Sequence, residues 1–239
     1  FNYLIINFIT FSLFFIFLFK KKKNLVKKNS FLYGWLFGFG YFASNLYWIS
    51  ISLTFDINFK FLIPFVLIII PAFFAIFYGL VTYFLFLFSN KKLLSNFLLF
   101  SLLFGFIEYS RGTILTGFPW NLIVYSFSNN LEILQIIAFI GTYAFNMLCI
   151  SFFISPAIFI LKENRKEIIV CIFFLLFPIL LHIIGSLKIK KFESLEIVKN
   201  DYVIRAIGSN VALDRFYINV NTSAVLEELI EISNPNLNT

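Results

Sequence analysis

The sequence predicts an α-helical, polytopic membrane bundle followed by the start of an α/β domain. Of its 239 residues, 60% are hydrophobic and only 13% are charged, with a mean hydropathy of +0.91. A soluble domain carries about 25% charged residues. Several apolar runs are long enough to cross a bilayer, which takes roughly 20 residues. After residue 187 the chain changes to mixed polar and apolar segments, so a second kind of domain begins there.

Six membrane spans follow from the apolar runs, at residues 1–19, 31–53, 61–88, 93–109, 131–161 and 167–187. The third and fifth exceed the length that a bilayer needs, so we expect them to tilt or kink, with Pro64, Pro71 and Pro156 as kink sites. The 37 Phe residues are interpreted as standing where Leu would serve, and not as an aromatic cofactor site.

Basic residues between the spans predict the orientation. One set of loops carries Lys20, Lys21, Lys22, Lys23, Lys27, Lys28, Lys91, Lys92, Lys162, Arg165 and Lys166. The opposite loops carry only Lys60 and Arg111. The lysine-rich side should be cytoplasmic. We therefore expect a multi-pass membrane protein, with the chain after the last span on the side opposite the cytoplasm.

The same placement explains the formal charge of +7 without a nucleic-acid partner. Cys149 and Cys171 lie inside apolar segments without a base or a metal-binding spacing, so the sequence predicts no metal, no cofactor and no nucleophile from them. His182 is the single histidine, and we interpret it as a packing residue for which the sequence shows no partner.

A polar interruption at residues 108–121 is the most informative stretch. Glu108 and Arg111 lie three apart at a helix end, so they can pair. One interpretation is an interfacial ion pair that anchors the helix. The other is a site for lipid headgroups or the polar end of a substrate, because the planar guanidinium suits phosphate. Gly112, Gly117 and Pro119 allow a tight turn here.

Aromatic and amide side chains near this interruption complete the candidate site. Trp120, Trp48 and Trp35 are typical of interfacial anchors, although Trp120 and Trp48 remain lipid-binding candidates together with Tyr47. Asn121 is a candidate because a buried amide needs several partners. Gly34 and Gly38 predict close helix packing, and Asn146 is interpreted as a polar contact between helices.

The tail predicts two elements of an α/β domain: a strand at 202–207 and an amphipathic helix at 221–233, capped by Thr222 or Ser223. Glu227 and Glu228 would face solvent. The apolar face would turn inward and consists of Val225, Leu226, Leu229 and Ile230. The predicted domains are 1–187 and 188–239. Because the chain begins at Phe1 and about 50 residues cannot complete such a domain, we expect it to be truncated at both ends.

Three segments resemble the apolipoprotein N-acyltransferase family. They are Gly34-Trp35-Leu36-Phe37-Gly38-Phe39-Gly40 leading to Asn45-Leu46-Tyr47-Trp48, then Glu108-Tyr109-Ser110-Arg111 leading to Thr116-Gly117-Phe118-Pro119-Trp120-Asn121, and finally Ile204-Arg205-Ala206-Ile207-Gly208-Ser209-Asn210. The charge spacing here is Glu-x-x-Arg, whereas the family usually has one more intervening residue. Val124 replaces a common Gly, and Tyr217 stands where Trp is usual, which makes Tyr217 a further candidate contact.

The resemblance implies a multi-pass protein of the bacterial inner membrane with eight spans. A further implication is an extracytoplasmic nitrilase-like (carbon–nitrogen hydrolase) domain, so the C-terminal part of this chain would lie on the periplasmic side. It also implies acyl transfer from a phospholipid donor, through an enzyme thioester, to the N-terminal amine of a diacylglyceryl-cysteine apolipoprotein. The family's Glu, Lys and Cys are expected beyond Thr239, so no catalytic residue is assigned and the fragment itself should be inactive. Two alternatives stay open: a multi-pass transporter or lipid-handling protein without covalent chemistry, and a degenerate paralogue that keeps only the fold.

Single cysteines introduced at Ser89 and Ser128 test the orientation. With the lysine-rich loops in the cytoplasm, a membrane-impermeant thiol reagent should label Ser128→Cys in intact spheroplasts, and Ser89→Cys only after lysis. The reverse pattern would overturn the predicted topology.

Overall fold

The computed structural model describes residues 4–21, 27–114, 117–195, 206, 208 and 222–233, and within these ranges it contains helices and no strand. The chain divides into two compact units, Phe1–Ser194 and Leu195–Thr239. The first unit holds α1 (Leu4–Lys21), α2 (Lys27–Leu46), η2 (Tyr47–Thr54), η3 (Ile57–Leu62), α3 (Ile63–Phe88), α4 (Leu93–Thr113), η4 (Ile123–Phe127), α5 (Leu131–Leu134), α6 (Ile137–Leu161) and α7 (Arg165–Glu193).

Five helical segments are long and apolar enough to cross a membrane within the described part of the chain: Leu4–Lys21, Ile57–Phe88, Leu93–Thr113, Ile137–Leu161 and Arg165–Glu193. They match five of the six predicted spans. The span predicted at 31–53 is the exception. Its residues form the helix α2, which ends at Leu46, and then the 3₁₀ helix η2. The glycines and polar residues of α2 make it less apolar than the others. Within the described residues, five of the six predicted spans are therefore helices long and apolar enough to cross a membrane by length and composition, and α2 is not among them.

The two overlong spans differ from the prediction near their starts. Pro64 lies in the first turn of α3 and not at a kink in its interior, as expected for a residue that lacks a backbone N–H donor. The fifth span is interrupted inside α6. There Gly141 adopts the non-helical angles φ 77° and ψ 167°, which separate the first turn of α6 from the rest of the helix. Pro71 and Pro156 do lie inside helices, as the sequence predicted.

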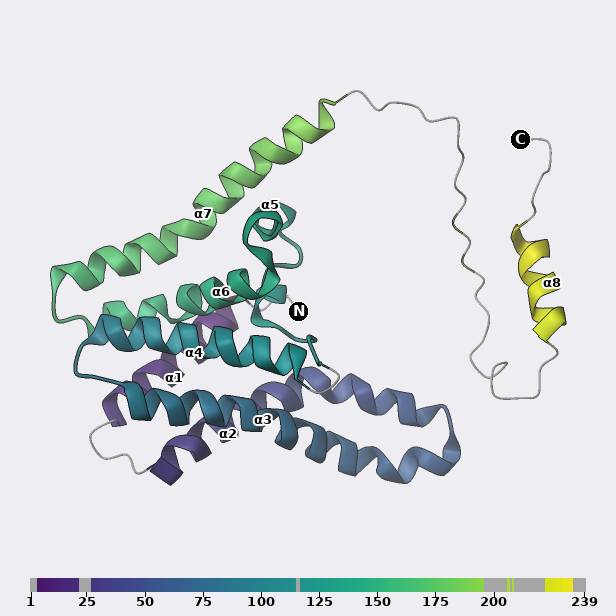
Figure 1. Ribbon diagram of the computed structural model, residues 1–239, viewed down its shortest axis with the longest axis horizontal. Coiled ribbons are helices and arrows are strands. Elements are labelled where there is room, and N and C mark those ends of the chain that lie inside the picture. Colours follow the sequence, from purple (N-terminus) through teal and green to yellow (C-terminus); the bar gives the residue numbers. More distant parts are fainter. Residues whose placement is uncertain are drawn as a thin grey trace. The chain divides into compact units, whose positions relative to one another are not determined.

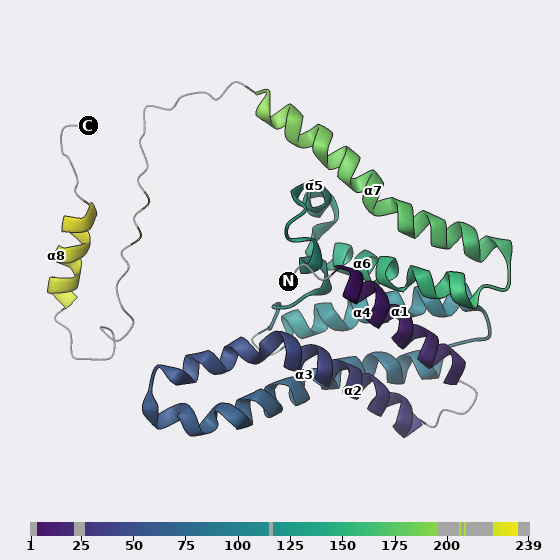
Figure 2. The same cartoon turned by 180° about the vertical axis from the view of Figure 1, so that it is seen from behind.

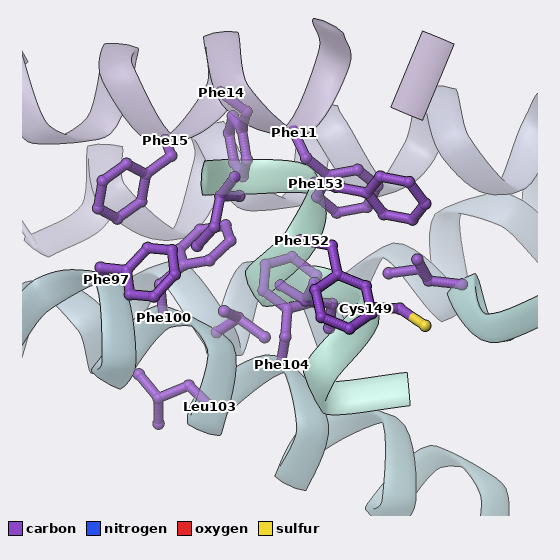
Figure 3. Close-up of a cluster of buried hydrophobic side chains, with 14 of the residues drawn as sticks. Phe11, Phe14, Phe15, Phe97, Phe100, Leu103, Phe104, Cys149, Phe152 and Phe153 are labelled. Atoms are coloured by element: carbon purple, nitrogen blue, oxygen red, sulfur yellow. The ribbon is translucent and has the colours of Figure 1, made fainter. Parts of the chain in front are cut away.

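Phenylalanine rings from three helices form the centre of the core. Figure 3 shows α1, α4 and α6 contributing to it, with Phe15 5.3 Å from Phe100 and Phe11 5.9 Å from Phe104 between ring centroids. Most of these pairs meet edge to face, the geometry that the ring quadrupole favours. The rings pack on one another with no polar group among the labelled residues, which agrees with interpreting the Phe excess as core filling.

Helices α2 and α3 lie side by side along most of their lengths (Figures 1 and 2). Gly34 and Gly38 allow this approach, since a Cβ at Gly34 would clash with Thr82 Oγ1 and the Tyr78 carbonyl oxygen. Polar bonds reinforce the contact: the Trp35 indole donates to the Ala72 carbonyl (3.0 Å), and the Thr82 hydroxyl donates to the Ser30 carbonyl (2.7 Å). Trp35 therefore bonds a neighbouring helix, a role that interfacial anchoring did not predict.

The second unit contains α8 (Thr222–Ser233), which confirms the helix predicted at 221–233. Leu226, Leu229 and Ile230 are exposed, not turned inward, because no other described element of this unit packs against them. The predicted strand at 202–207 falls outside the described residues except for Ala206.

Replacing Gly34 tests the close contact between α2 and α3. We expect Gly34→Ala to destabilise the protein by about 1–3 kcal/mol, the usual cost of overpacking, and to lower its melting temperature in detergent. Gly40→Ala is the matched control, because a Cβ there meets no atom within 4 Å. Equal melting temperatures for the two variants would show that α2 and α3 are not held this closely.

Candidate functional site

The polar interruption predicted from the sequence forms around a buried ion pair. Glu108 and Arg111 lie on adjacent turns near the end of α4, and the Arg111 Nη2 donates to Glu108 Oε2. Glu108 is 0% exposed and Arg111 2% exposed. The predicted pairing is confirmed. The pair is enclosed by protein and does not lie at the molecular surface, so the interfacial-anchor interpretation does not describe it.

Arg111 also fixes the loop that follows α4. Its Nη1 donates to the carbonyl oxygens of Phe118 (2.6 Å) and Trp120 (3.1 Å). The guanidinium carbon lies 5.3 Å from the centroid of the Phe42 ring on α2 and 6.0 Å from that of the Phe74 ring on α3. A cation over an aromatic face gains electrostatic stabilisation. One side chain thus joins α2, α3, α4 and the loop.

Two residues with positive φ turn this loop back along α4. Gly117 has φ 74°, and a Cβ on it would clash with the Gly112 carbonyl oxygen. Asn121 has φ 59°, a region that Asn tolerates better than most residues with a side chain. Between them, the Phe118 amide donates to the Arg111 carbonyl (3.1 Å), and the Phe118 ring stacks on Phe74. Thr116, the first residue of the predicted motif, lies outside the described residues.

Asn121 ties the loop to α2. Its side-chain Nδ2 donates to the Asn45 carbonyl (2.9 Å), and its own carbonyl accepts a bond from the Tyr41 hydroxyl (2.8 Å). The amide is therefore engaged by the protein. Because Tyr47 and Trp48 lie two and three residues after Asn45, these bonds place the exposed aromatics of η2 and the 58%-exposed Trp120 near the same end of α2.

A cavity of about 600 Å³ lies beside this anchored loop, between α1, α2 and residues 121–126. Its volume falls in the range of small-molecule sites, about 300–1,000 Å³. The wall is mainly apolar, and several polar side chains interrupt it: Asn7, Thr10, Tyr41, Ser44, Asn45, Asn121 and Ser126. Asn7 donates to Ser126 Oγ (2.6 Å), which closes the wall between α1 and η4.

The predicted site residues divide into three groups. Asn121 lines the cavity, whereas Glu108 and Arg111 support the loop behind it. Trp120, Tyr47 and Trp48 are exposed and do not line it. Tyr217 lies outside the described residues. Asn7 and Ser126 were not predicted from the sequence. Asn7 could have been noticed as a polar residue within an apolar span. No local sequence pattern, however, relates it to Ser126, which lies 119 residues further along the chain.

The remaining polar residues act within the bundle. Asn146 Oδ1 accepts a bond from the Val124 amide (2.9 Å), so it holds η4 against α6, in keeping with its predicted role as a polar contact. His182, for which the sequence showed no partner, has Nδ1 3.8 Å from Glu132 Oε2. Cys149 and Cys171 are buried among apolar side chains. No group of three or more His, Cys, Asp or Glu residues in the described ranges could hold a metal ion.

Comparison with known proteins gives a consistent set of relatives. Residues 1–155 match the family model described as the apolipoprotein N-acyltransferase N-terminal domain. Proteins named apolipoprotein N-acyltransferase are similar from Brucella melitensis (37% identity), Rhizobium etli (36%) and Rickettsia prowazekii (40%). The alignments cover 52%, 57% and 49% of this chain, and 24%, 26% and 24% of those proteins. The chain thus spans about a quarter of the length of the curated relatives it matches.

Breaking the ion pair tests how much the site depends on it. Arg111→Met leaves a buried carboxylate unpaired and removes both loop bonds, so we expect a loss of about 3–5 kcal/mol in the free energy of unfolding, measured by thermal denaturation in detergent. Glu108→Gln together with Arg111→Met should recover part of this loss.

Lys60→Met is the charge-matched control for this experiment, since Lys60 is exposed and should change stability by no more than about 0.5 kcal/mol. A melting temperature for Arg111→Met equal to that of Lys60→Met would mean that the pair does not hold the fold together.

Proposed function

The chain belongs to the apolipoprotein N-acyltransferase family, and on that premise we propose that it is the membrane bundle of an enzyme that N-acylates apolipoproteins. In this proposal a cysteine thiolate attacks the ester carbonyl of a phospholipid, forming a thioester and releasing the lysophospholipid. The α-amine of a diacylglyceryl-cysteine then attacks the thioester, forming the amide and returning the thiol. This reaction is the last step of lipoprotein maturation.

The catalytic Glu, Lys and Cys of this mechanism are proposed to lie beyond Thr239, in an extracytoplasmic nitrilase-like domain that begins near residue 188. The buried thiols of the bundle support this view. Cys149 and Cys171 are buried, so neither thiol has access to an ester in solution. Activation of a thiol needs both a lowered pKa or a base and accessibility. The bundle would then bind and position substrate and leave the covalent chemistry to the following domain.

The cavity beside the anchored loop supports a positioning role. Hydroxyl, amide and carbonyl groups line a wall that otherwise belongs to apolar helices, so the cavity can accept the glycerol and ester region of a phospholipid through hydrogen bonds. Exposed Trp120, Tyr47 and Trp48 at the same end of α2 suit the interfacial zone, where an aromatic ring contacts both chains and headgroups. We propose that this end faces the periplasm, as the distribution of basic loop residues supports.

A lipid-handling or transport protein without covalent chemistry is the second candidate. The polar cavity favours it as much as the first, since such sites within bundles also bind transported substrates. The sequence that follows Thr239 in the gene distinguishes the acyltransferase from the protein without covalent chemistry. A Glu soon after, and a Lys and a Cys later in an α/β pattern, support the enzyme; their absence rules it out. Complementation by the full-length gene distinguishes an active enzyme from a degenerate paralogue.

Acyl transfer by the full-length protein tests the role of the loop. We expect Trp120→Ala and Arg111→Ala to lower the rate by about tenfold or more, because small displacements of a positioning element cost large factors in rate. Cys171→Ser is the control for a bundle residue away from the loop and should stay close to the unsubstituted protein. The measurement is transfer of a labelled acyl chain from phospholipid to a diacylglyceryl peptide in proteoliposomes.

Arg111→Ala can also lose activity by unfolding, so each rate is normalised to the folded fraction seen by size-exclusion chromatography. Trp120 is exposed, and its replacement should leave that fraction unchanged. If folded Trp120→Ala and Cys171→Ser proteins transfer acyl chains equally well, the loop contributes only to packing.

A further inference from the structure

A second polar cavity lies at the other end of α4. It has a volume of about 660 Å³ and lies where the α3–α4 and α6–α7 connections come together, on the left in Figure 1. Its wall includes Lys91 and Lys92 before α4 and Arg165 and Lys166 at the start of α7. Because α4 has 21 residues, this cavity is roughly 30 Å from the anchored loop. It is therefore separate from the candidate site above.

The charges around this cavity favour an anion. All four basic side chains are exposed, and within the described residues none of them lies within ion-pair distance of a carboxylate. Two acidic residues also line it, Glu163 and Glu167. Glu167 is buried and already engaged, since its Oε2 accepts bonds from the backbone amides of Glu163 and Asn164 in a capping box. Only Glu163 remains exposed against four cations.

An apolar crevice continues from the basic cavity into the membrane-spanning region. Its volume is about 330 Å³, and only apolar side chains line it: Leu94 and Leu98 of α4, and Ile169, Val170, Phe173 and Phe174 of α7. Leu94 lines both cavities, so the two adjoin. The helices meet beneath the crevice, where the Phe97 and Phe174 ring centroids are 5.2 Å apart.

We propose that this compound site binds one phospholipid with a net negative headgroup. The phosphate would lie among the lysines and Arg165, whose planar guanidinium can contact two phosphate oxygens at once. An acyl chain would lie in the crevice between α4 and α7. Basic pockets between spanning helices on the lysine-rich side of a membrane suit acidic headgroups in this way. A bound lipid would fill the crevice and stabilise the docking of α7 on the bundle.

The basic cavity and the apolar crevice lie side by side, and a ligand with one charged end and one apolar end accounts for both. Lysines that only set orientation need no apolar crevice next to them. Conversely, a crevice that only faces bulk lipid does not require cations at its opening. Here the opening carries four cations that have no carboxylate partner among the described residues. Charge complementarity above and hydrocarbon-sized apolar space below select a ligand that has both parts.

Native mass spectrometry of the full-length protein in detergent, titrated with phosphatidylglycerol or phosphatidylcholine, tests this proposal. We expect one phosphatidylglycerol to be retained per protein, and phosphatidylcholine to bind at least about tenfold more weakly. The double variant Lys92→Gln with Arg165→Gln should weaken phosphatidylglycerol binding by about tenfold or more. Its melting temperature without added lipid should match that of the unsubstituted protein, since both side chains are exposed.

The matched control is Lys190→Gln with Lys191→Gln, which removes the same charge at the far end of α7, outside the cavity. Equal weakening by both double variants, or equal affinity for the two lipids, would overturn the proposal. Glycerol 3-phosphate provides the headgroup phosphate without chains and should fail to displace the lipid at matched concentration. Displacement at that concentration would make the crevice irrelevant and would also overturn it. These readouts are independent of acyl transfer.

Discussion

The architecture around the 117–126 loop depends on keeping one cation inside the bundle. Arg111 is buried, and both terminal nitrogens of its guanidinium are bonded: Nη2 to the Glu108 carboxylate and Nη1 to two loop carbonyls. The rings of Phe42 and Phe74 lie near the same charge, whereas Nε has no hydrogen-bond partner. Leaving a buried charge without such partners costs several kcal/mol. The partners come from α2, α3, α4 and the loop, so these segments are constrained together, and the position of Asn121 against α2 follows from it.

The sequence predicted the interactions that are local and missed those that depend on folding. The Glu108–Arg111 pair was predictable because three residues on a helix bring side chains to one face. Its burial was not, since the enclosing rings belong to other helices. Five of the spans located by hydropathy match long apolar helices. The run at 31–53 instead divides into α2 and η2, and the glycines of α2 serve its contact with α3.

The polar cavity shows the limit most clearly. Its wall is closed by Asn7 and Ser126, which lie 119 residues apart in the chain, and His182 meets Glu132 across a similar kind of long-range contact. No spacing rule relates such residues, because their proximity is set by how α1 and α7 pack on the rest of the bundle. The Phe-rich composition was easier to interpret than the polar cavity. Phenylalanine rings pack against one another in the core and need no polar partner there.

The unusual backbone at Gly141 has a consequence for how such chains are traced through a bilayer. A Cβ there would meet no atom within 4 Å, so φ, and not space, is what selects glycine. The break divides an overlong apolar run into a short cap at residues 131–140 and a helix of ordinary crossing length. Because the cap does not cross the membrane by itself, the parity of crossings is unchanged. An apolar run of this length therefore counts once when the sides of successive loops are assigned.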